Sequence, residues 1–130
     1  MYTTFESQVK ELIGKKILRV EGVKTGSDNV MLFFESGRLL LTHYQDCCER
    51  VYLGDWEGDP GDLVGKELVS AAETRNETED LEACSVDRWT FYSFRTTGGD
   101  LWLRWLGTSN GYYSTAVHVE WAPARASSKN

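Results

Sequence analysis

The chain has 130 residues, of which 41% are apolar and 12% aromatic, and these proportions are those of one globular domain rather than a disordered segment. Fourteen basic residues against twenty acidic ones give a net charge of −6, which argues against polymeric nucleic acid as a partner. No apolar stretch approaches the roughly 20 residues that a membrane span requires. Because no basic segment followed by an apolar stretch marks the N-terminus, we expect no signal peptide, no membrane partner and a cytoplasmic location.

The cysteines are Cys47, Cys48 and Cys84, an odd number that does not suggest a disulfide framework. Neighbouring cysteines bridge each other with difficulty, because a disulfide needs a wider separation of the two backbones. For a protein that stays in a reducing cytosol, we therefore expect free thiols at these positions.

The N-terminal part of the sequence predicts a short helix and several strands. Apolar residues recur at helical spacing over 3–13, and Thr3 with Glu6 fits a capping box at its start. The strands expected next are 17–23, 30–35 and 38–43. The last two are apolar on both faces, so they need a covering that one short helix is too small to provide. The sequence thus implies a second layer or a partner subunit.

The C-terminal part predicts mostly strands separated by turns. Turn-forming residues dominate 44–65, where a short strand at 51–53 and a helical turn near Asp62-Leu63 are expected. Residues 67–74 fit a strand or a helix, whereas the acidic stretch 76–80 is expected to be a solvated loop. The strongest strand patterns are 89–96, 101–106 and 115–121.

These elements predict an α+β fold, mainly antiparallel β-sheet with a short N-terminal helix. The last strand alternates cleanly, so Val117, Val119 and Trp121 are expected to point inward. We expect a single ligand-binding domain over residues 1–122 and a disordered tail over 123–130.

The first candidate site is the segment from His43 to Glu49. A histidine near two cysteines could ligate zinc or activate a nucleophile, but no Cys-x-x-Cys pair is present, and we expect no metal, cofactor or catalytic residue. Two interpretations remain open: these side chains contact a ligand, or they only hydrogen-bond a tight corner of the chain. The candidate ligand contacts in this segment are His43, Gln45 and Asp46.

The second candidate is the aromatic and arginine-rich segment 88–113. Aromatic rings stack on nucleobases, and a guanidinium group can hold a phosphate through two parallel hydrogen bonds. The alternative is an aromatic core covered by arginine stems, and most of the tryptophans are expected to be core. An arginine set between Trp102 and Trp105 is hard to explain as mere surface. The candidate ligand contacts here are Arg104, Phe91 and Arg95.

The third candidate is the turn that Asn110-Gly111 predicts. Two tyrosines follow it, either at a loop edge where they meet a ligand or another subunit, or folded back onto the core. Asn110, Tyr112 and Tyr113 therefore complete the predicted ligand contacts. The carboxylates between 55 and 62 miss the spacing of a calcium-binding loop, so a solvated acidic loop is expected there.

Four motifs occur together: His43-x-Gln45-Asp46-Cys47-Cys48-Glu49-x-Val51, Gly58-Asp59-x-x-Asp62-Leu63-x-Gly65, Trp89-Thr90-Phe91-Tyr92, and Arg104-Trp105-x-Gly107-x-Ser109-Asn110-Gly111-Tyr112-Tyr113-Ser114. With them, residues 14–121 resemble small phage-encoded proteins, the Thoeris anti-defence sponges. The resemblance implies a protein of the host bacterial cytoplasm that captures cyclic ADP-ribose isomers, the messengers of bacterial TIR enzymes, without cleaving them. It further implies a homodimer or hexamer with pockets between subunits and, in some members, a separate site for cyclic oligonucleotides.

Two functions of other classes compete with the sponge. The acidic balance would also suit an inhibitor that binds a host defence protein. An enzyme that degrades cyclic nucleotides is the third possibility, with His43 or His118 as its general acid or base.

Overall fold

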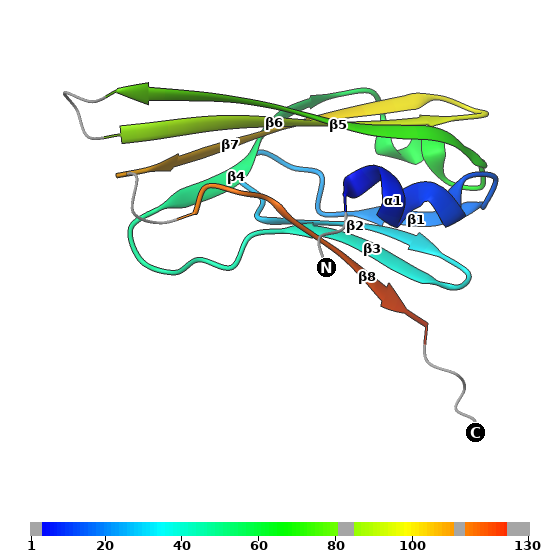
Figure 1. Cartoon of the computed structure of the whole chain (residues 1–130). Helices are drawn as coiled ribbons and strands as arrows, with labels where there is room; N and C mark the ends of the chain where they lie inside the picture. Colours follow the sequence, from blue (N-terminus) through cyan, green and yellow to red (C-terminus); the bar gives the residue numbers. More distant parts are fainter. Residues whose placement is uncertain (1–3, 81–84, 111–113, 125–130) are drawn as a thin grey trace.

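Two antiparallel sheets pack face to face, and a short helix lies at one side between them (Figure 1). The computed structural model describes residues 4–80, 85–110 and 114–124. The prediction of a mainly antiparallel β protein with a short N-terminal helix is confirmed. The layer that the two-sided apolar strands require is the second sheet of the same chain.

The first sheet has the strand order β1-β2-β3-β8 and forms the lower layer in Figure 1. Its strands are β1 (Ile17–Glu21), β2 (Asn29–Phe34), β3 (Gly37–Thr42) and β8 (His118–Pro123). The predicted hairpin of 30–35 with 38–43 is confirmed, with Phe34 paired to Gly37 next to the turn. Strand β8 returns from the far end of the chain and pairs with β3, so that Leu39 lies opposite Trp121.

The second sheet has the order β4-β7-β6-β5. Its strands are β4 (Arg50–Glu57), β5 (Leu68–Asp80), β6 (Ser85–Thr96) and β7 (Asp100–Ser109). The prediction of a loop at 76–80 is wrong, because these residues continue β5 and pair with β6, from Asn76 opposite Trp89 to Asp80 opposite Ser85. This polar stretch lacks an apolar alternation because it belongs to an edge strand with a neighbour on one side only.

The N-terminal helix α1 spans Phe5–Val9 and is followed by a 3₁₀ turn, η1, at Lys10–Leu12. Its cap is Thr4, whose Oγ1 accepts from the Ser7 N–H at 3.1 Å, so the expected Thr3–Glu6 capping box is corrected by one position. The expected helical turn near Leu63 is η2 (Pro60–Leu63). In the described ranges, none of the helical segments has the length and apolar composition needed to cross a membrane.

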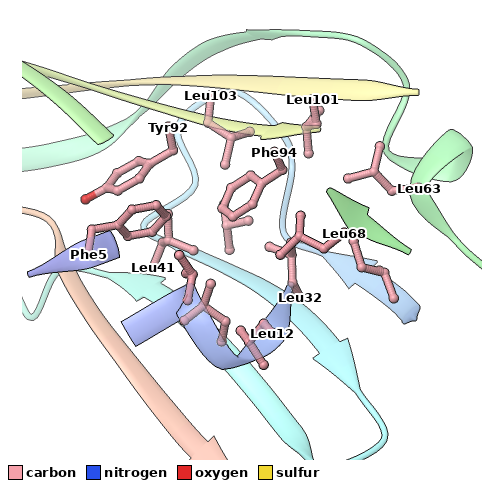
Figure 2. Close-up of a cluster of buried hydrophobic side chains, with 14 of the residues drawn as sticks. Phe5, Leu12, Leu32, Leu41, Leu63, Leu68, Tyr92, Phe94, Leu101 and Leu103 are labelled. Atoms are coloured by element: carbon pink, nitrogen blue, oxygen red, sulfur yellow. The ribbon is translucent and has the colours of Figure 1, made fainter. Parts of the chain in front are cut away.

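The core fills the space between the two sheets (Figure 2). The inward residues of each sheet meet there, and Phe5 of α1 packs against Tyr92 with ring centroids 5.0 Å apart. The hydroxyl of Tyr92 donates to Glu73 Oε2 at 2.6 Å. Burial and this carboxylate raise the pKa of Tyr92, which keeps the phenol protonated. The largest fully buried side chains are Trp105, Tyr92, Phe94, Ile17, Leu32, Leu39, Leu41, Leu53, Leu63, Leu68, Leu101 and Leu103.

Truncating one of these side chains tests the sandwich core. Leu32 on β2 is fully buried, so Leu32→Ala should lower the free energy of unfolding by about 2–5 kcal/mol, because it leaves a cavity between the sheets. Leu18, 49% exposed on β1, is the matched control, and Leu18→Ala should change that free energy by less than about 1 kcal/mol. Urea unfolding monitored by circular dichroism measures both, and equal losses would contradict this assignment of the core.

Candidate functional site

Strand β7, in the middle of the second sheet, presents a different set of residues on each face. Leu101, Leu103 and Trp105 are almost completely buried against the first sheet. Trp102 is 50% exposed and the Arg104 side chain 46% exposed on the opposite, outer face. The expectation that most tryptophans are core is therefore wrong for Trp102, because the period of two along a strand places it outside.

A β-bulge in β4 decides which of its residues face outward. The pairing with β7 shifts register between Leu53 and Asp55, so that Gly54 is an extra residue on that strand. Beyond the bulge, Asp55 lies opposite Arg104 on the outer face and Trp56 packs against the core. The expected solvated acidic loop is thus wrong for Asp55 and Glu57, which are strand residues beside an exposed tryptophan.

The register gathers aromatic side chains from three strands around one arginine. Phe91 of β6 lies opposite Arg104, and Arg104 lies opposite Asp55. In the next row, Trp89 lies opposite Leu106, and Leu106 lies opposite Tyr52. We call this surface the aromatic–arginine face, and it consists of Tyr52, Asp55, Glu57, Trp89, Phe91, Trp102, Arg104 and Leu106.

Arg104 lies at the centre of this face with two kinds of contact. Its guanidinium carbon is 5.2 Å from the ring centroid of Trp89, and its Nη2 donates to Asp55 Oδ2. Beside it is a hollow of about 400 Å³, lined by the three face residues Phe91, Trp102 and Glu57 together with the ion pair and parts of β4 and β7. Stacking surfaces and a cation adjoin there, which is the chemistry expected at a nucleotide site.

Arg50 was not among the residues predicted from the sequence. Its guanidinium carbon lies 4.5 Å from the centroid of the Tyr52 ring, at the start of β4. Both Arg50 and Arg104 thus cover aromatic rings of the same cross-strand row, Tyr52 and Trp89. An arginine two positions before a tyrosine in a strand is a signal for such a stacked pair, but only once β4 is known to extend beyond 51–53.

The other predicted contacts of this region lie apart from Arg104. Arg95 is on the outer side of β6 near the β6–β7 turn, and its Nε is 3.6 Å from Asp100 Oδ2. Asn110 is exposed directly after the end of β7. Tyr112 and Tyr113 lie outside the described residues. Of the residues predicted in the second and third candidate sites, the structure therefore brings together Arg104 and Phe91.

His43, Gln45 and Asp46 belong to a corner between β3 and β4, organised around Glu49. The Glu49 carboxylate accepts from the backbone N–H of Asp46 at 2.8 Å and of Cys47 at 3.0 Å. His43 Nε2 lies 2.7 Å from Glu49 Oε2, and His43 Nδ1 lies 2.9 Å from the Ala116 carbonyl oxygen. Both ring nitrogens of His43 are therefore engaged by oxygen atoms of the protein.

The Gln45 amide also donates to the Glu49 backbone carbonyl, and the sulfur atoms of Cys47 and Cys48 lie side by side. Free thiols at those two positions remain a prediction, and Cys84 lies outside the described residues. Over the described ranges, no three His, Cys, Asp or Glu side chains are grouped to hold a metal ion.

The same hydrogen bonds control the titration of Glu49. The Cys47 N–H lowers its pKa most, burial opposes this, and His43 and the Asp46 N–H lower it further, to about 2 from an ordinary value of 4.5. Glu49 is therefore ionised at neutral pH although only 3% of the residue is exposed. Its partners fit the interpretation of this segment as a hydrogen-bonded corner; ligand contact by His43, Gln45 or Asp46 remains a prediction.

The chain belongs to the family described as "Domain of unknown function (DUF7448)", which matches residues 10–119. This range begins directly after α1 and covers the corner, the bulge and the whole aromatic–arginine face. No curated protein and no solved structure gives a significant match.

The ionised Glu49 predicts a specific pH dependence. Because its pKa is lower in the folded state, its contribution to stability is complete above about pH 4.5 and is lost as the pH falls toward about 2. The Glu49→Gln variant should therefore have a lower free energy of unfolding than wild type at pH 7. This difference in free energy should narrow as the pH falls from about 4.5 to about 2. Urea unfolding at a series of pH values measures this.

Exposed Glu35→Gln provides the matching chemical change away from the corner. It should follow the wild-type stability curve across this range more closely than Glu49→Gln does. A constant offset between Glu49→Gln and wild type from pH 7 to pH 2 would contradict the assignment of the ionised carboxylate to Glu49.

Proposed function

We propose that this member of the DUF7448 family binds and sequesters a nucleotide second messenger, such as a cyclic ADP-ribose isomer, on its aromatic–arginine face. The observation that carries the proposal is the position of Arg104, half exposed among Trp89, Phe91 and Trp102 at the edge of a hollow of about 400 Å³. That volume is within the range of small-molecule sites. A nucleobase would stack on an exposed ring while the guanidinium group holds a phosphate oxygen.

Binding without cleavage is the form of the proposal that the corner supports. His43, the first candidate for acid–base chemistry, is buried and has an oxygen atom at each ring nitrogen. A ring engaged in this way is poorly placed to exchange protons with a ligand. His118 is exposed on β8, in the first sheet, whereas the aromatic–arginine face belongs to the second.

Sequestration also bears on the subunit arrangement. A messenger must be held tightly, and nanomolar affinity corresponds to about −12 kcal/mol, which a single half-exposed ion pair does not provide. The hollow beside Arg104 is bounded by one sheet face only. We therefore include in the proposal a homodimer or hexamer in which a second copy covers the bound ligand.

A protein partner is the second candidate, favoured by the exposed area of Trp102 beside an arginine. Tryptophan, tyrosine and arginine are the residues enriched where protein interfaces are strongest. An inhibitor of a host defence protein would use the same face. Recovery of a stoichiometric protein complex from host lysate, with no small molecule bound, would favour this function over the sponge.

The sponge is tested by incubating the purified chain with the products of an active TIR enzyme, filtering, denaturing the protein and identifying the released molecules by mass spectrometry. We expect an intact cyclic ADP-ribose isomer. Arg104→Ala should weaken its binding about ten- to a hundredfold, since a charge-assisted hydrogen bond is lost, and Arg104→Lys should restore it in part.

Arg19→Ala is the matched control. Arg19 also lies over an aromatic ring, 4.0 Å from the centroid of Phe33, and beside a carboxylate, Glu21, but on the first sheet. The Arg19→Ala variant should bind the cyclic ADP-ribose isomer as tightly as wild type does. Release of a linear product would indicate an enzyme, and equal affinities of the Arg104 and Arg19 variants would contradict the proposed location.

A further inference from the structure

The carboxylate of Asp55 occupies the position at Arg104 that an anionic ligand would take. Its Oδ2 accepts from the Arg104 Nη2, and the two side chains are 53% and 46% exposed. A carboxylate and a phosphate oxygen make the same kind of charge-assisted hydrogen bond to a guanidinium group. A ligand that binds Arg104 through phosphate therefore competes with Asp55 for the Nη2 of this guanidinium group.

The β-bulge is what places this carboxylate. Counting from the buried Leu53 with a period of two, an unbulged β4 would turn Asp55 toward the core and Trp56 toward solvent. The extra residue at Gly54 reverses this, so that Asp55 faces outward opposite Arg104. Bulges commonly re-aim a side chain next to a site. The pairing of Asp55 with Arg104 is thus built into the backbone and does not depend on a chance meeting of two surface side chains.

We propose that Asp55 is a resident counter-ion that determines which anions the aromatic–arginine face accepts. The assignment rests on the proposed function, because it concerns the same arginine. A ligand with one weakly charged group replaces the Asp55–Arg104 ion pair by another ion pair of similar strength, so it gains little affinity. A ligand gains affinity when it brings more than one phosphate together with a ring that stacks on Trp102, Phe91 or Trp89. Asp55 thereby selects diphosphate-containing nucleotides over simple anions.

A phosphate that takes the place of Asp55 at the Arg104 Nη2 also leaves the Asp55 carboxylate beside it without this ion pair. Glu57 lies on the same strand and also lines the hollow, so two carboxylates and one guanidinium group line it together. Like charges brought together at a binding surface disfavour association. Inorganic anions, which have no ring to stack, should therefore bind this face weakly in the wild-type protein.

The experiment compares wild type with Asp55→Asn, a substitution that keeps the side-chain shape and removes the charge. Isothermal titration calorimetry measures the affinity for inorganic pyrophosphate and for cyclic ADP-ribose, and thermal unfolding verifies that each variant is folded. We expect Asp55→Asn to bind pyrophosphate about fivefold more tightly, the size of an exposed ion pair. In an Arg104→Ala background the same substitution should bring no gain.

Glu21→Gln is the matched control, because Glu21 Oε2 is paired with Arg19 at 2.6 Å on the first sheet and the charge changes equally. It should leave the pyrophosphate affinity unchanged. The proposal would be overturned if both variants gained the same affinity for pyrophosphate, or if Asp55→Asn gained none. Weaker binding of cyclic ADP-ribose by Asp55→Asn would overturn it too, since Asp55 would then contact the ligand directly.

The two proposals fail in different ways. A pyrophosphate gain in Asp55→Asn that disappears with Arg104→Ala supports the counter-ion even if no variant binds a nucleotide, and in that case only the nucleotide function is wrong. Cyclic ADP-ribose binding that depends on Arg104, with no pyrophosphate gain in Asp55→Asn, overturns the counter-ion and retains the nucleotide function.

Discussion

The alternation of strand β7 is the constraint on which both the core and the candidate site depend. One row of its side chains, Leu101, Leu103 and Trp105, is buried between the sheets, and the other row presents Trp102 and Arg104 to solvent. A shift of β7 by one residue would exchange the two rows, burying the guanidinium group and exposing the leucines. The packing of the core therefore also fixes the orientation of Arg104, and no further interaction is needed to hold the guanidinium group on the outer face.

The corner around Glu49 connects the two sheets in a different way. Strand β3 belongs to the first sheet and β4 to the second, and the chain between them is held by one ionised carboxylate with partners from its own loop. His43 extends this network to the carbonyl of Ala116, just before β8. Charge inside a protein is tolerated where each polar atom is satisfied, and here it fixes the point from which β4 begins.

The sequence predicted local features well and long-range pairings poorly. The hairpin around Ser36-Gly37 and the inward side of Val119 and Trp121 follow from patterns a few residues long. The pairing of Asp55 with Arg104 depends on a bulge and on a register between strands 49 positions apart. The single-neighbour strand at 76–80 carries no apolar alternation to reveal it. Arg104 and Phe91 were identified by residue type alone, before any register placed them together.

The bulge at Gly54 has a consequence for how the family can vary in length. Loops such as the one between β4 and β5 can gain or lose residues singly, because their ends only need to stay within reach. In strand β4, loss of Gly54 alone would remove the bulge and still leave Asp55 facing outward directly after Leu53. One residue more or fewer between Asp55 and Trp56 would instead exchange the inward and outward positions of Trp56 and Glu57. Among relatives that keep the same charged and aromatic surface, a single-residue gap in this strand should therefore fall at the position of Gly54.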